Sequence, residues 1–265
     1  MQAIYTLDYF KSIILGFIEG VTEFLPISST FHLLLASRAL GLSSNEYIKL
    51  FDIFIQSGAI LAVVWLYRHE LITRLDLLGK TLVAFIPTAI LGIVLYHPIK
   101  NIFMEEMLGQ VILFIGFGLI FLFFEWMVNK KIIRLEKSIF SLTYPQALLI
   151  GASQVLAFFP GVSRAGAVIL IMMLLGFRRA EAAFFSFFLA IPTIISAGLF
   201  DLFKSRSVLT SFSHQILPLS LGFIVSFLVA MAAIRWFINY LKVHSLSLFA
   251  FYRFFLGGLT LIWIL

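Results

Sequence analysis

Residues 19–32 read EGVTEFLPISSTFH, and they interrupt a stretch of sequence that is otherwise apolar. The interruption separates two short apolar segments, at 9–25 and 31–42. A second interruption reads PGVSR at 160–164 and also stands between short apolar segments. A short segment, a break and another short segment predict a re-entrant hairpin. Broken backbone is tolerated at membrane depth only where protein or a water-filled cavity surrounds it.

The composition of the whole chain favours a membrane protein. Of its 265 residues, 62% are hydrophobic and 12% are charged, whereas a soluble domain has about 45–50% and about 25%. The absence of cysteine excludes disulfides, thiolate zinc sites and cysteine nucleophiles. We attribute the net charge of +6 to cytoplasmic loops, and therefore expect no nucleic-acid partner.

Ten apolar segments organise the chain. They cover 9–25, 31–42, 48–67, 77–96, 107–128, 144–159, 165–177, 180–200, 216–240 and 246–265. Spanning a bilayer takes about 20 apolar residues, and the third, fourth, fifth, eighth, ninth and tenth segments meet this requirement. The segments predict an all-α, polytopic integral membrane protein that forms a single membrane domain over 1–265.

The two breaks are related by an offset of 135 residues, which aligns Glu19 with Gln154 and Ser28 with Ser163. This relation predicts two internal repeats, at 1–130 and 139–265, joined by a basic linker. Each repeat would contain one re-entrant helix pair and three transmembrane helices. Because three crossings are an odd number, the repeats would have inverted topology, with a site near the membrane midplane.

Loop charges predict the orientation of the protein in the membrane. Ten basic residues would lie on the face that holds the linker, namely Arg68, Arg74, Lys80, Lys130, Lys131, Arg134, Lys137, Arg178, Arg179 and Lys242. Six would lie on the face that holds both termini, namely Lys11, Arg38, Lys49, Lys100, Lys204 and Arg206. The positive-inside rule then makes the linker face cytoplasmic and both termini external.

Two glutamates mark the first break. Ionisable groups inside apolar spans cost at least about 2.5–3.5 kcal/mol, so they are assigned to function by default. Glu19 and Glu23 are four residues apart on one helix face, where two bare carboxylates repel each other. A divalent cation would relieve the repulsion, and Mg²⁺ or Ca²⁺ suits oxygen ligands. A proton or cation relay in a transporter is the alternative.

Hydroxyl groups follow these glutamates. Ser28, Ser29 and Thr30 precede a short helix, and His32 lies one turn inside it. Such hydroxyls are often only helix N-caps, and a lone membrane histidine is more often a packing residue. Behind two intramembrane glutamates, the same cluster indicates an anion site, because a helix start offers free N–H groups.

The second break supplies a cation. Ser163 and Arg164 begin the second short helix, and the planar fork of arginine binds phosphate oxygens bidentately. Inverted repeats would bring both short-helix N-termini to one cavity, which would fit a pyrophosphate with a bridging metal. Gln56 lies within a span and either reaches this cavity or bonds another helix. Arg253 is either buried and paired or near a helix end.

These residues resemble the undecaprenyl-pyrophosphate phosphatases of the bacitracin-resistance (BacA) type. The resemblance rests on 19–32 and 160–164, and extends through QSGAIL at 56–61, FSFFLAIP at 185–192 and YRF at 252–254. It implies a bacterial inner-membrane enzyme that uses a divalent cation to remove the terminal phosphate of undecaprenyl pyrophosphate. It further implies recycling of the lipid carrier for peptidoglycan synthesis, bacitracin resistance and a site facing the periplasm or exterior. A homodimer is left open.

Carried over by position, the resemblance implies two sets of site residues. The catalytic set is Glu19, Glu23, Ser29, His32 and Arg164, of which Glu19 and Glu23 bind the metal. The substrate-binding set is Ser28, Thr30, Ser163 and Arg164, to which we add Gln56. The nucleophile is left open among the serine, the histidine and a water. We expect Ser29, with His32 as its proton partner.

Three positions depart from the usual family pattern. Phe31 replaces a glycine, and Ala165 and Val168 replace a serine and a threonine. We expect Phe31 to add bulk where either the backbone or the substrate approaches. We also expect two phosphate contacts to be lost, each worth about 1.5–3 kcal/mol. A weaker enzyme, or one for another lipid phosphate, is therefore an alternative. A transporter or flippase of polyprenyl phosphate or another lipid phosphate is a further hypothesis, since fold alone does not separate the two functions.

Overall fold

The computed structural model describes residues 7–42, 46–103, 107–204 and 216–264, and these residues are almost entirely helical. Arg206, one of the basic residues used to predict the orientation, lies outside these ranges. The helices are α1 (Tyr9–Thr22), α2 (Ser29–Ala39), α3 (Glu46–Leu66), α4 (Arg68–Thr73), α5 (Leu75–Phe103), α6 (Met107–Asn129), η1 (Ile139–Ser141), α7 (Tyr144–Ser153), η2 (Gln154–Phe158), α8 (Arg164–Leu174), α9 (Arg179–Lys204), α11 (Ile216–Val243) and α12 (Ser247–Ile264).

Six of the described helices are long and apolar enough to cross a membrane: α3, α5, α6, α9, α11 and α12. They are the six segments predicted to span, so the predicted all-α, polytopic membrane fold is confirmed. The sequence segment at 144–159 is divided, because α7 ends at Ser153 and the chain tightens into the 3₁₀ helix η2. The short polar helix α4, which forms the corner between α3 and α5, was not predicted.

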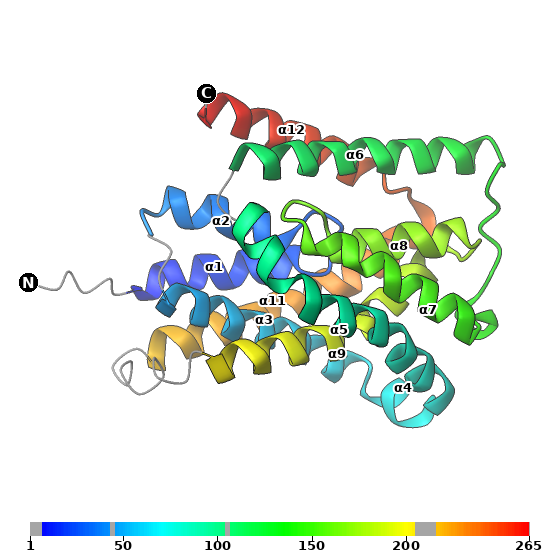
Figure 1. Cartoon of the computed structure of the whole chain (residues 1–265), viewed down its shortest axis with the longest axis horizontal. Coiled ribbons are helices and arrows are strands. Elements are labelled where there is room, and N and C mark those ends of the chain that lie inside the picture. Colours follow the sequence, from blue (N-terminus) through cyan, green and yellow to red (C-terminus); the bar gives the residue numbers. More distant parts are fainter. Residues whose placement is uncertain (1–6, 43–45, 104–106, 205–215, 265) are drawn as a thin grey trace, which may run out of the picture.

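The two pairs of short helices enter the bundle from opposite ends (Figure 1). The start of α1 and the ends of α2 and α12 lie at one end of the molecule. The linker between α6 and α7 lies at the other end, where the backbone N–H groups of Glu136 and Lys137 donate to the oxygen of Gly176, just after α8. This arrangement agrees with two re-entrant pairs of opposite direction.

Most of the main contacts between helices have an equivalent contact between the corresponding helices of the other half of the chain. Helix α1 packs along α11 as α7 packs along α5, and α3 contacts α11 as α9 contacts α5. Equivalent helices also contact each other, α3 with α9 and α6 with α12, whereas the contact between α8 and α9 has no counterpart of similar size between α2 and α3. Such a pattern is consistent with the predicted repeats at 1–130 and 139–265.

The two breaks have unusual backbone geometry. Ser28, just before α2, has a φ of +66°, which is rare for a residue with a side chain and costs about 1–3 kcal/mol. In the second break, Gly161 has a φ of +94°. A Cβ there would lie 3.1 Å from the backbone nitrogen of Phe114 and against the oxygen of Gln110. Glycine is therefore required for this break to approach α6 closely.

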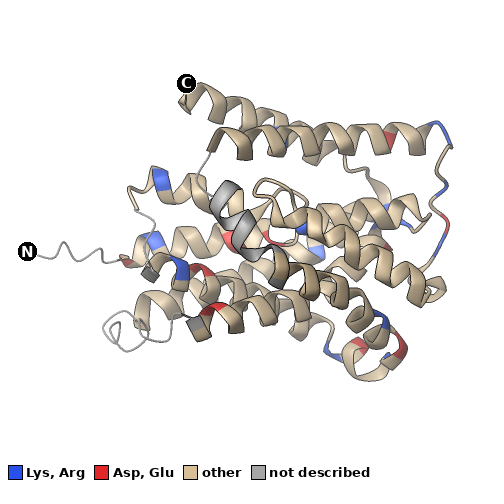
Figure 2. Ribbon diagram, viewed as in Figure 1, with Lys and Arg blue, Asp and Glu red and all other residues tan. Residues whose placement is uncertain are grey.

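Charged residues gather at the two ends of the molecule, while a small group lies near its centre (Figure 2). The apolar core surrounds that central group, with Phe24, Val168 and Phe187 among its fully buried members. Charges enclosed by such a core are expensive, so the central group indicates a functional region.

Candidate active site

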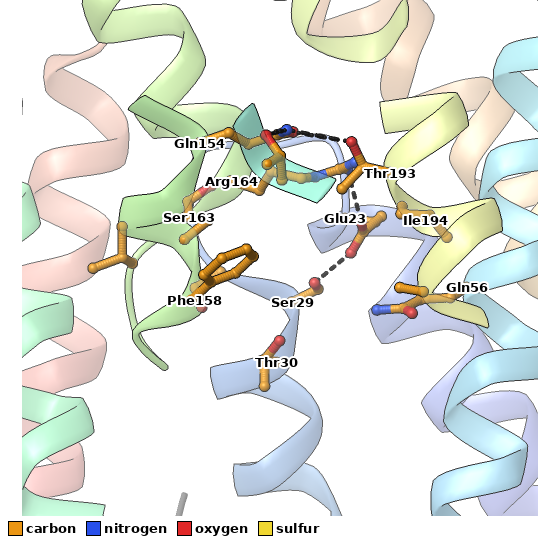
Figure 3. Close-up of a pocket in the computed structure, with 15 residues that line it drawn as sticks. Glu23, Ser29, Thr30, Gln56, Gln154, Phe158, Ser163, Arg164, Thr193 and Ile194 are labelled. Atoms are coloured by element: carbon orange, nitrogen blue, oxygen red, sulfur yellow. Dashed lines mark hydrogen bonds and ion pairs between the residues drawn. The ribbon is translucent and has the colours of Figure 1, made fainter. Parts of the chain in front are cut away.

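The two breaks meet at a cavity of about 190 Å³ near the middle of the bundle (Figure 3). Its lining comes from both re-entrant pairs and from α3, α5 and α9. The lining residues are Glu23, Ser28, Ser29, Thr30, Gln56, Thr88, Gln154, Ala157, Phe158, Val162, Ser163, Arg164, Thr193, Ile194 and Ala197. The structure thus brings together seven of the predicted site residues, and leaves His32 and Glu19 off the cavity wall.

Glu23 is the centre of a chain of polar contacts between the two breaks. Its Oε1 accepts a hydrogen bond from Arg164 Nη2 at 2.9 Å, which is also an ion pair. Its Oε2 accepts a short hydrogen bond from the hydroxyl of Ser29. Figure 3 shows the three side chains converging from α1, α2 and α8. One carboxylate therefore positions both a cation and a hydroxyl at the cavity.

Arg164 has spare hydrogen-bonding capacity. It is the first residue of α8, and its Nη1 is buried without a hydrogen-bond partner among the described residues. An unpaired buried N–H donor costs about 1–3 kcal/mol, and more when the group is charged. A phosphate oxygen in the cavity would satisfy Nη1, and the helix start favours an anion there. This unpaired donor makes the cavity better suited to an anion than to a neutral ligand.

Ser163 serves mainly to connect the two breaks. As the N-cap of α8, its hydroxyl oxygen accepts a hydrogen bond from the backbone N–H of Gly166 at 3.1 Å. The same hydroxyl lies 3.4 Å from the carbonyl oxygen of Leu25 in the first break and donates to it. The hydroxyl of Ser163 thus both donates and accepts a hydrogen bond within the protein, although the side chain borders the cavity.

The expected pairing of Ser29 with His32 is wrong in this structure. The His32 ring is hydrogen-bonded through Nδ1 to the carbonyl oxygen of Ser28 at 2.8 Å and through Nε2 to the hydroxyl of Tyr252 at 2.7 Å. Because a carbonyl only accepts, Nδ1 must carry a proton. The ring also stacks on Tyr252, with centroids 5.6 Å apart. His32 therefore supports the backbone just before Ser29. Glu23, and not His32, accepts the hydroxyl hydrogen of Ser29.

Glu19 lies one helical turn from Glu23 and is fully buried. Neither of its carboxylate oxygens has a hydrogen-bond partner among the described residues. Over the same residues, no group of three or more His, Cys, Asp and Glu side chains is arranged to hold a metal ion. Two carboxylates still fit Mg²⁺, which is usually bound by one or two carboxylates with substrate phosphates and water.

Three further residues of the cavity wall were not predicted to belong to the site. The side-chain amide of Gln154 donates to the hydroxyl of Thr88 at 2.8 Å and to that of Thr193 at 3.2 Å. Gln154 is the residue that the offset of 135 aligns with Glu19, so the repeat relation contained the signal. Neither threonine had any such signal, because each is one of several hydroxyl residues in a long apolar helix.

The three departures from the usual family pattern lie away from the cavity. Phe31 is fully buried and stacks on Phe114, with ring centroids 4.2 Å apart. Ala165 and Val168 are buried in the main core. None of them lines the cavity. Phe31 thus packs against α6 and not on the cavity wall, and its effect on the substrate stays a prediction.

Arg253 connects both breaks from the opposite side of the molecule. It is fully buried in α12, and its Nε donates to the carbonyl oxygen of Pro26 at 2.9 Å. Its Nη1 donates to the carbonyl oxygens of Gly161 at 3.0 Å and of Phe114 at 3.1 Å. Of the two predicted alternatives, the buried and bonded one is thus confirmed, although its partners are backbone carbonyls and not a carboxylate.

The fold and this cavity define a class: polytopic membrane proteins that enclose a buried polar cavity where two broken helices meet. Comparison with known proteins specifies the family. Residues 12–259 match the family described as bacitracin resistance protein BacA, and the chain belongs to it.

Similar proteins cover nearly the whole chain. A protein of Wolinella succinogenes named undecaprenyl-diphosphatase is 40% identical over 97% of this chain and 99% of its own length. Proteins of the same name from Aquifex aeolicus and a Sulfurihydrogenibium species are 42% and 43% identical, over 93% and 96% of this chain and 95% and 98% of their own lengths.

Proposed function

We propose that this protein hydrolyses undecaprenyl pyrophosphate to undecaprenyl phosphate and inorganic phosphate. The reaction would recycle the lipid carrier for peptidoglycan synthesis and confer resistance to bacitracin. The observation that supports it best is the contact chain Ser29–Glu23–Arg164, which ends in a buried, unpaired N–H donor of Arg164. The names of the relatives favour hydrolysis over the transport of a lipid phosphate.

The polar and apolar parts of the cavity wall suit the two parts of this substrate. The diphosphate would lie against Arg164, Ser29 and Thr30, whose donors suit phosphate oxygens. The first isoprene units would lie against apolar lining residues such as Phe158, which borders the cavity beside Ser163 (Figure 3).

Glu23 and Ser29 would carry out the transfer of the phosphoryl group. An incoming diphosphate competes with Glu23 for Arg164, which frees the carboxylate to accept the hydroxyl proton of Ser29. Oγ of Ser29 then bonds to the terminal phosphorus, the bond from this phosphorus to the bridging oxygen breaks, and undecaprenyl phosphate leaves. Glu23 gives its proton to the departing phosphate and then takes a proton from the water that attacks the phosphoserine. Inorganic phosphate leaves as the phosphorus–Oγ bond breaks, and Glu23 returns that proton to Oγ.

We further propose a divalent cation, Mg²⁺ or Ca²⁺, held by Glu19 and Glu23. The buried, unpartnered oxygens of Glu19 support this assignment. When bound, the ion would neutralise charge on the diphosphate.

We propose that the protein lies in the bacterial inner membrane, with the linker end in the cytoplasm and both termini and the site facing the exterior. The excess of Lys and Arg expected at the linker end supports this orientation. A homodimer stays a prediction.

Phosphate release from undecaprenyl pyrophosphate by the purified protein in detergent tests the proposal. Wild type with Mg²⁺ is expected to release phosphate, and EDTA to abolish the release. Ser29→Ala is expected to lose both the activity and a phosphoenzyme trapped by acid quench, while the exposed Ser220→Ala serves as the matched control. No release by wild type would refute hydrolysis. If Ser29→Ala stays active, water and not Ser29 is the nucleophile.

A further inference from the structure

A second cavity lies at the corner where α4 turns into α5, beneath η1 of the linker. Its volume is about 380 Å³. We call it the corner cavity, and its lining consists of Thr73, Arg74, Leu75, Asp76, Leu77, Lys80, Ile139 and Phe140. It shares no residue with the catalytic cavity, and the reaction proposed above does not use it.

The corner cavity lies at the start of a helix that is long and apolar enough to cross a membrane. The membrane-crossing part of α5 begins at Leu75, which is itself part of the lining. Tyr144, which is about half exposed, lies nearby, since Nζ of the lining residue Lys80 faces its ring at 5.8 Å from the centroid. Such amphipathic rings are enriched at the membrane–water boundary.

Two cations border the corner cavity, against one carboxylate. Lys80 is only 8% exposed, and its Nζ donates to Asp76 at 2.5 Å, which uses one of its three N–H donors. The guanidinium of Arg74 lies 4.7 Å from the ring centroid of Phe140, and among the described residues it has no carboxylate partner. The cavity therefore has a net positive charge and unused donors.

Apolar side chains surround these cations. Ile72, Leu75 and Phe140 are 74%, 71% and 75% exposed, so they face outward at the level where acyl chains begin. Aliphatic and aromatic groups beside a cationic cavity match an amphiphile with a negative head and apolar chains. An inorganic anion would leave the apolar groups without a partner.

We propose that the corner cavity binds an anionic phospholipid, with its phosphodiester on Arg74 and Lys80 and its acyl chains against Ile72, Leu75 and Phe140. The first turn of α5 adds backbone N–H groups that a helix start leaves unpaired. The linker end is rich in basic residues (Figure 2), which attracts anionic lipid to this region. The bound lipid fastens the linker to the corner between α3 and α5.

Native mass spectrometry of the full chain in detergent tests this inference. The protein is titrated with phosphatidylglycerol, with phosphatidylcholine of the same acyl chains, and with inorganic phosphate. Wild type is expected to bind one phosphatidylglycerol at least about tenfold more tightly than phosphatidylcholine, and Arg74→Gln to lose this preference. Lys130→Gln removes the same charge from an exposed linker residue outside the cavity and is expected to bind as wild type does.

A second variant separates binding from folding. Arg74→Lys retains the cation and is expected to keep most of the preference for phosphatidylglycerol, whereas Arg74→Gln loses it. Equal binding of the two lipids by wild type, unchanged binding by Arg74→Gln, or equal losses in Arg74→Gln and Lys130→Gln would each overturn the proposal. Displacement of the lipid by millimolar inorganic phosphate would overturn the assignment to a lipid.

Discussion

Arg253 offers the sharpest test of how the site is assembled. A single side chain of α12 donates to carbonyl oxygens in both breaks, Pro26 at 2.9 Å and Gly161 at 3.0 Å, and to Phe114 at 3.1 Å. Each such bond from a charged donor is worth about 1.5–3 kcal/mol. The guanidinium also lies 4.7 Å from the ring centroid of Phe114, in the face-on geometry of a cation–π contact.

The expected magnitude depends on the replacement. Arg253→Met leaves three carbonyls without this donor but removes the desolvation cost of a buried cation, so we expect a net loss of stability of about 3–5 kcal/mol. Arg253→Lys retains the charge, yet one ammonium lacks the planar fork that reaches both breaks at once. We expect Arg253→Lys to fold and its two breaks to separate slightly. A misplacement of about 1 Å between reacting groups costs about 100-fold in rate.

Steady-state phosphate release and thermal unfolding measure these effects together. For Arg253→Lys we expect kcat to fall about 100-fold and KM to change much less, because Arg164 still binds the diphosphate. Arg235→Lys, the same change at an exposed position of α11, is the control and should match wild type. A folded Arg253→Lys with wild-type kcat would refute the role of Arg253 in positioning the breaks.

Three further predictions follow from the same contacts. Glu23→Gln weakens the bonds to both Arg164 and Ser29, so phosphate release should fall at least about 100-fold; activity within a few-fold of wild type would contradict the role of Glu23 as proton acceptor. Tyr252→Phe removes the hydroxyl partner of the His32 ring and should lower kcat several-fold while thermal unfolding changes little, and an unchanged kcat would show that the contact has no role in the reaction. Phe31→Ala should lower the free energy of unfolding by about 3–5 kcal/mol, as measured by chemical denaturation, because it leaves a cavity against Phe114. If Phe31→Ala instead changes KM without changing stability, Phe31 contacts the substrate.

Much of the fold could be predicted because the bilayer imposes strong constraints. Its thickness fixes the length of a spanning helix, so six segments of sufficient length gave six spans. The breaks were visible because proline and polar residues interrupt apolar runs. The polar corner α4 was missed, since six residues without an apolar pattern give no helical signal.

The candidate site was predictable only in part. Glu23 and Arg164 stood out because charges are rare and costly in an apolar chain. The partners of each residue were not visible: Ser29 and His32 are three residues apart, yet one contacts Glu23 and the other Tyr252. Neighbours on a short helix can have different partners because each turn brings them against different helices.

By itself, the sequence determined that this is a helical membrane protein with two related breaks and charged residues at them. Those properties follow from local composition, which the bilayer converts directly into structure. The tertiary structure alone decided that Arg253 bonds to both breaks, that the two threonines line the cavity, and that Phe31 packs on Phe114. Their positions depend on how helices distant in sequence pack against one another, and local sequence carries no record of that packing.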